Sequence, residues 1–158
     1  MARRLGPQQA ALYAAEAASI DGLGIVWRRL ADAQHAVDGL VGSAWFAERW
    51  PHFVRAVVER RGRGATWSTC DPLDAAGPGG RPTEGVILVA GALRQPTVLH
   101  ELTHLLLPRG AGHGRDFAEA MLALVRHEMG FVAYVEYLHA LRGHEPFRAI
   151  GQDRAISA

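Results

Sequence analysis

The chain has 158 residues and a mass of 17.1 kDa, with 49% hydrophobic and 21% charged residues, which is typical of one globular domain. Seventeen basic residues, all arginine, and sixteen acidic residues give a net charge of +1. This balance argues against a dedicated nucleic-acid-binding protein. A single cysteine, Cys70, excludes an internal disulfide and a cysteine-rich zinc site, whereas the eight histidines could supply a different kind of metal site.

No segment of the sequence indicates export or membrane insertion. The N-terminal residues carry arginines but lack the apolar stretch of about 7–15 residues that a secretory signal needs. No apolar run approaches the ~20 residues that span a bilayer. We therefore expect a cytoplasmic protein that has no membrane partner.

The first half of the chain predicts two helices followed by two strands. Apolar residues recur at helical spacing in residues 8–19 and again in residues 27–40, and each stretch predicts an amphipathic helix. The β-branched residues of segment 53–59 predict a strand. Residues 61–64, Arg-Gly-Arg-Gly, predict a hairpin turn into a second strand over residues 65–70.

The second half predicts a loop, a third strand and three helices. Residues 71–82 are rich in proline and glycine and predict the loop. Residues 85–90 are apolar on both faces and predict a central strand, beside which an extended substrate could add to an exposed edge. Helical spacing returns in residues 96–107, 115–129 and 131–141, and the chain from Gly143 onward is expected to be frayed. This order predicts one α+β domain over residues 1–158, with a small three-stranded sheet packed against helices.

The helix predicted over residues 96–107 carries an H-E-x-x-H motif, His100-Glu101-Leu102-Thr103-His104. Residues four apart lie on one face of a helix, so both imidazoles can reach one Zn²⁺. Glu101 can then take a proton from a metal-bound water, whose pKa zinc lowers to about 7. The alternative is a pair of surface histidines with a helix-stabilising glutamate, and the apolar residues at neighbouring positions of the helix favour the metal site.

A catalytic zinc site usually has three protein ligands and one open position. His113 lies nine residues after His104, between two glycines that permit tight geometry, and it is the favoured third ligand. This spacing is longer than the six residues of the metzincin pattern and argues against that class. Glu119 and Glu128, on the following helix, are the alternative third ligands, and a loop-capping role is the alternative for His113 itself.

The segments His100–His104 (HELTH) and Gly112–Phe117 (GHGRDF) resemble the signature of SprT-like zincins. The chain is more closely similar to a family of small metallohydrolases of actinobacteria, which share an N-terminal segment like Gln8–Glu16 (QQAALYAAE). The resemblance implies a zincin-like domain with Glu101 as the general base and zinc on three histidines, His100, His104 and His113. SprT-like proteins often carry a cysteine-rich zinc ribbon and DNA-binding regions. This sequence has neither, which argues against carrying over repair of DNA–protein crosslinks from these proteins.

These observations favour a zinc-dependent hydrolase, and most of all a metallopeptidase that acts on a peptide or protein through water activated by Glu101. One alternative is a non-catalytic zinc-binding domain that acts through a protein partner. Another is a DNA-associated SprT-like protease, against which the near-neutral net charge argues. A peptidase also needs a group that stabilises the oxyanion, and the candidates are Arg115, His127, Tyr134, Tyr137 and His139.

Overall fold

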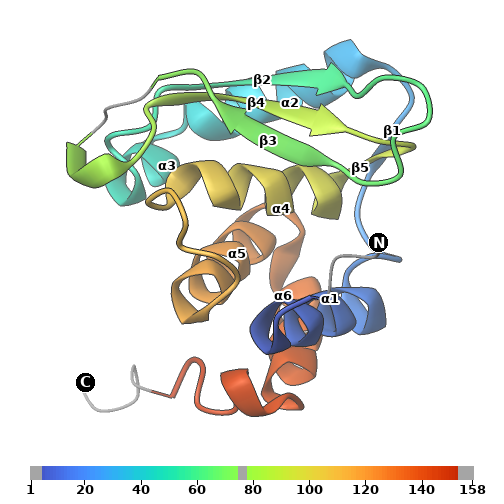
Figure 1. Cartoon of the computed structure of the whole chain (residues 1–158), viewed down its shortest axis with the longest axis vertical. Helices are drawn as coiled ribbons and strands as arrows, with labels where there is room; N and C mark the ends of the chain where they lie inside the picture. The colour runs from blue at the N-terminus through green and yellow to red at the C-terminus, as the bar shows by residue number, and fades with distance from the viewer. Residues whose placement is uncertain (1–4, 75–77, 153–158) are drawn as a thin grey trace. The chain divides into compact units, whose positions relative to one another are not determined.

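The structure is a computed structural model, and it describes residues 5–74 and 78–152 (Figure 1). Its contacts divide the chain into two compact units. One unit combines the residues up to Gly24 with those from Ala111 onward, and the other is Ile25–Gly110. The architecture is α+β with a small mixed sheet, as the order of predicted elements indicates. The expectation of a single domain stays a prediction.

The first unit is built from three helices, α1 (Pro7–Ser19), α5 (Arg115–Glu128) and α6 (Gly130–Arg142). Helix α6 packs against both of the others. The three helices match the predicted segments closely, because the apolar spacing in the sequence is the spacing of their buried faces. Gly130 has a φ of 90°, a conformation that favours glycine, and the chain changes direction there between α5 and α6.

The chain after α6 is more ordered than its composition indicates. A short 3-10 helix, η2 (Glu145–Phe147), contacts α1 and α6. Phe147 and Ile150 are both 2% exposed. The expectation of fraying from Gly143 is therefore wrong for the described residues, because these two apolar side chains anchor the segment in the core of this unit.

The second unit holds a three-stranded sheet in the order β2 (Arg55–Arg60), β4 (Glu84–Val89), β3 (Thr69–Pro72). Strand β2 runs parallel to β4, and β3 runs antiparallel to it. The central position of β4 confirms the prediction for residues 85–90. Its backbone is paired on both sides, so the expectation that a substrate could add beside this strand is wrong, and the outer strand next to α4 is β3.

The hairpin predicted around residues 61–64 is wrong. The two strands that flank this turn are β2 and β3, and β4 lies between them. The local Arg-Gly-Arg-Gly pattern indicates a turn, but it cannot show that a more apolar strand from later in the chain pairs with both neighbours. Strand β3 also begins at Thr69 and takes two residues from the loop expected over residues 71–82. The rest of that loop includes η1 (Pro78–Gly80) and residues 75–77, which lie outside the described residues.

Two short strands alter the predicted start of the second helix. Strand β1 (Val26–Trp27) pairs antiparallel with β5 (Leu93–Arg94). Helix α2 therefore spans Leu30–Val41 rather than beginning at residue 27, because the backbone of Trp27 pairs with Leu93. Helix α3 (Ala44–Arg49) follows, and the side chain of Ser43 caps it by accepting a hydrogen bond from the Phe46 amide.

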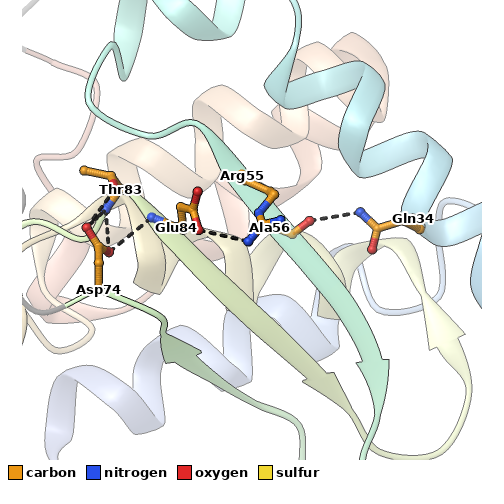
Figure 2. Close-up of polar contacts among 6 residues, drawn as sticks. All are labelled: Gln34, Arg55, Ala56, Asp74, Thr83 and Glu84. Carbon is orange, nitrogen blue, oxygen red and sulfur yellow. Dashed lines mark hydrogen bonds and ion pairs between the residues drawn. The ribbon is translucent and has the colours of Figure 1, made fainter.

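The side-chain amide of Gln34, on α2, pairs with the outer edge of β2 (Figure 2). Its Nε2 donates to the Ala56 carbonyl oxygen at 2.9 Å, and its Oε1 accepts from the Val58 amide at 2.7 Å. Across β2 and β4, Arg55 forms an ion pair with Glu84 at 3.0 Å. Gln34 thus satisfies two backbone groups that an edge strand would otherwise present to solvent.

Asp74 joins the end of β3 to the start of β4 (Figure 2). Its carboxylate accepts hydrogen bonds from the Thr83 hydroxyl at 2.7 Å, from the Thr83 amide and from the Glu84 amide. These donors favour the charged form, and the pKa of Asp74 is held below its ordinary value.

Helix α4 (Gln95–Leu106) lies against one face of the sheet and contacts β3 and β4 (Figure 1). The contact is close at Gly85, where a Cβ atom would lie 2.5 Å from both δ carbons of Leu105. Any larger residue at this point of β4 would therefore displace the side chain of Leu105 or the helix that carries it. Among the described residues, no helix is long and apolar enough to cross a membrane.

Candidate metal centre

Two histidines of the candidate centre lie on α4, one turn apart. The helix follows β5 directly, with Pro96 in its first turn, and it ends before Pro108, which agrees with the position preferences of proline. The ring centroids of His100 and His104 are 5.0 Å apart, with an interplanar angle of 71°. His100 is buried and His104 is partly exposed, so solvent reaches this face of the helix at His104 and not at His100.

The third histidine, His113, lies in the turn that precedes α5. Gly112 has a φ of 67°, and Gly114 is the N-cap residue of the helix, so both glycines that flank His113 take part in the turn. The imidazole contacts two rings: its centroid is 5.2 Å from that of Tyr13 and 5.0 Å from that of Phe117. Tyr13, on α1, is a residue that the sequence reasoning missed, since an exposed tyrosine on a helix carries no signal of its own.

Ligand nitrogens of His100, His104 and His113 all lie within 4.8 Å of one another. A zinc ion with Zn–N distances of about 2.0–2.1 Å needs ligand nitrogens about 3.4 Å apart in a tetrahedral arrangement. Three neutral imidazoles are also a donor set that zinc accepts in catalytic sites. The cluster could therefore bind a metal ion, and in the described part of the chain it is the one group of three or more histidine, cysteine or carboxylate ligands that meets this criterion.

The alternative third ligands take part in other interactions. Glu119 forms an ion pair with Arg115 at 2.8 Å, and both side chains are about half exposed. Oε1 of Glu128 lies 2.8 Å from Nδ1 of the neighbouring His127. Neither carboxylate belongs to the histidine cluster.

Tyr137, one of the residues considered for the oxyanion, is fully buried. Its hydroxyl lies 3.4 Å from a carboxylate oxygen of Glu16, to which it donates. Burial and the Glu16 charge raise the pKa of Tyr137 well above its ordinary value. A protonated hydroxyl inside a helical core has a structural role, so Tyr137 is a poor candidate for contact with a substrate.

Glu101 has a neighbour that the sequence reasoning did not use. It is 8% exposed on α4, and the thiol of Cys70, on β3, donates a hydrogen bond to it. Burial, then the negative charge of Glu101, then that of Asp71 raise the pKa of Cys70 to about 12. The thiol is thus protonated at neutral pH. No sequence signal links residues 70 and 101, because the register of β3 and the packing of α4 on the sheet bring them together.

His52 lies at the C-terminal end of α4. Its ring donates a hydrogen bond to the Leu106 carbonyl, whereas its Nε2 is buried and has no hydrogen-bond partner among the described residues. Burial and the nearby charge of Arg81 lower its pKa. The imidazole is therefore neutral at pH 7 and belongs to the packing of this helix end.

No family model matches the chain, and comparisons with curated proteins and with solved structures found no match.

Proposed function

We propose that this protein is a zinc-dependent hydrolase, and specifically a zincin-like metallopeptidase similar to the SprT-like proteins and to the small metallohydrolases of actinobacteria. The observation that carries the proposal is the convergence of three imidazoles, with two of them on the helix that also carries Glu101. Three neutral ligands leave the metal its full charge and a fourth position for substrate or water.

In this proposal the zinc is held by His100, His104 and His113. Zinc bound there would supply a Lewis acid that polarises the scissile carbonyl and lowers the pKa of water. Glu101 accepts the proton of the attacking water and then returns it to the nitrogen of the leaving amine. The burial of Glu101 supports this role, because a carboxylate shielded from bulk solvent keeps its proton-transfer partners within the site.

The arrangement of the sheet supports a peptide as the substrate. Strand β3 is an outer strand of the sheet and contacts α4. An extended peptide can pair with such an edge through its main chain, whatever its sequence. A peptide bound along β3 would run beside the helix that carries the H-E-x-x-H motif.

Metal analysis tests the proposed ligands. The purified wild-type protein should contain about one zinc per chain, and His113→Ala should bind zinc about 100-fold or more weakly. His35→Ala is the matched control, since His35 is exposed on α2 and outside the cluster, and it should keep wild-type zinc content. Unchanged zinc affinity in His113→Ala would rule out His113 as a ligand and direct attention to Glu119 and Glu128.

Turnover of a peptide library tests the chemistry. The zinc-loaded wild type should cleave peptides, whereas Glu101→Gln should bind zinc normally and lose about 10²–10⁴-fold in kcat, the contribution of a general base. Full activity of Glu101→Gln would refute the role of this carboxylate. Zinc binding by the wild type without cleavage of any peptide would favour the non-catalytic zinc-binding domain.

A further inference from the structure

Cys70 lies on the face of the sheet that packs against α4. In the antiparallel pairing of β3 with β4, Cys70 is opposite Ile87, and directly opposite residues project to the same face. Ile87 is fully buried, and Gly85, two residues before it on the same face, approaches Leu105 of α4. The register of β3 therefore directs the Cys70 side chain toward the helix.

The group that Cys70 meets on that helix is the carboxylate of Glu101, to which the thiol donates a hydrogen bond. A buried carboxylate is costly unless donors satisfy its oxygens, so this contact is one of those that make the burial of Glu101 tolerable. The thiol is protonated at neutral pH, as described above, and it is always available as a donor.

We propose that Cys70 is a positioning residue that fixes the orientation of the Glu101 carboxylate. This inference rests on the proposed function, because it assigns Cys70 to the general base of that reaction. A carboxylate on a flexible side chain rotates unless one of its oxygens is held, and proton transfer needs the other oxygen within hydrogen-bond reach of water. A thiol is a weak donor, so it orients one oxygen of the carboxylate while the other stays available to water.

Substitutions at Cys70 test the role in turnover. Zinc-loaded Cys70→Ala should lose about 10–100-fold in kcat, the usual effect of removing a group that orients a site residue, with KM and zinc content within about twofold of wild type. Cys70→Ser, which keeps a donor, should recover most of that loss. Thr69→Ala is the matched control on the same strand, and it should keep wild-type kcat.

The reactivity of the thiol tests the contact itself and needs no substrate. Because Cys70 is the sole cysteine, alkylation by iodoacetamide at pH 9 reports on this residue alone. Glu101→Gln removes the larger of the two charges that raise the Cys70 pKa, so the Cys70 thiol should be alkylated faster than in wild type. The rate should rise about three- to fourfold for each unit by which the pKa falls, because the larger thiolate fraction is partly offset by a weaker nucleophile. Asp71→Asn removes the weaker of the two charges and should give a smaller increase.

The outcomes separate the two proposals. An alkylation rate in Glu101→Gln equal to that of wild type, or below that of Asp71→Asn, would overturn the contact. Faster alkylation combined with wild-type kcat in Cys70→Ala, or a Cys70→Ser variant as slow as Cys70→Ala, would overturn the positioning role alone. Absence of turnover by the zinc-loaded wild type would overturn the proposed function, and the positioning role with it, even where the alkylation rates support the contact.

Discussion

The substitution Gly85→Ala tests whether the close contact between β4 and α4 sets the position of the histidine helix. The new Cβ atom would lie 2.5 Å from both δ carbons of Leu105 and 3.0 Å from its γ carbon. Carbon atoms in contact prefer separations of about 3.5–4.0 Å, so the overlap with the δ carbons is about 1.0–1.5 Å. Leu105 is 1% exposed and cannot turn into solvent, so either its side chain takes a strained position in the core or the helix moves away from the sheet.

An overlap of this size in a packed core costs about 1–3 kcal/mol in the free energy of unfolding. For a chain of 158 residues, an unfolding entropy of about 2.1 cal/mol/K per residue converts this cost to a fall in Tm of about 3–9 °C. Urea denaturation followed by circular dichroism measures the free energy of unfolding, and a thermal scan measures Tm. Zinc affinity should fall as well, because His104 adjoins Leu105 on α4.

A matched control and a double mutant make this reasoning refutable. Gly39 lies inside α2, and a Cβ atom added there would have no neighbouring atom within 4 Å, so Gly39→Ala should stabilise the protein by up to about 1 kcal/mol. Leu105→Ala alone should cost about 2–5 kcal/mol. Combined with Gly85→Ala it should cost less than the sum, by about 0.5–3 kcal/mol. If the costs of Gly85→Ala and Leu105→Ala simply add in the double mutant, no steric conflict exists. A Gly85→Ala variant as stable as Gly39→Ala would show the same.

Three further substitutions give independent expectations. Gln34→Ala removes both hydrogen bonds to the edge of β2 and should lower the free energy of unfolding by about 1–3 kcal/mol, and an unchanged urea midpoint would contradict this. Tyr13→Ala should weaken zinc binding about tenfold by loosening His113, whereas Tyr13→Phe, which keeps the ring, should bind zinc like wild type in a competition titration. Because burial and Arg81 hold the His52 pKa below its ordinary 6.5, the folded state disfavours the protonated ring. The stability that the neutral His52 ring contributes is therefore fully present above about pH 6.5 and is lost as the pH falls below that value. Wild type should lose more stability than His52→Gln between about pH 7.5 and 5.5, and parallel curves would contradict this reasoning.

The helices of this protein could be predicted from the sequence because each carries its own signal. The apolar stripe, the proline near the start of α4 and the glycine at the start of α6 are local features, and local features decide where a helix begins and ends. The sheet could not be predicted in the same way. Whether β2 pairs with β3 or with β4 depends on segments about 30 residues apart, and a turn pattern says nothing about a third strand that fits between two others.

The same distinction between local and long-range signals applies to the candidate site. His100, Glu101 and His104 could be recognised because five consecutive residues on one helix carry their spacing, and His113 followed as the nearest histidine in a glycine-flanked turn. Tyr13 and Cys70 could not be found from spacing. Each lies about 30 or more residues from the group it contacts, and each is brought there by packing or by strand register.

The side-chain amide of Gln34 makes the two edges of the sheet unequal. An exposed strand edge is a template on which another chain can pair, and a three-stranded sheet has two such edges. Since Gln34 occupies backbone groups on β2, an incoming chain finds its open template along β3, which packs on α4. Under the proposed function, self-association through strands and binding of an extended peptide would compete for this edge, so at high concentration a second copy of the protein would inhibit peptide binding.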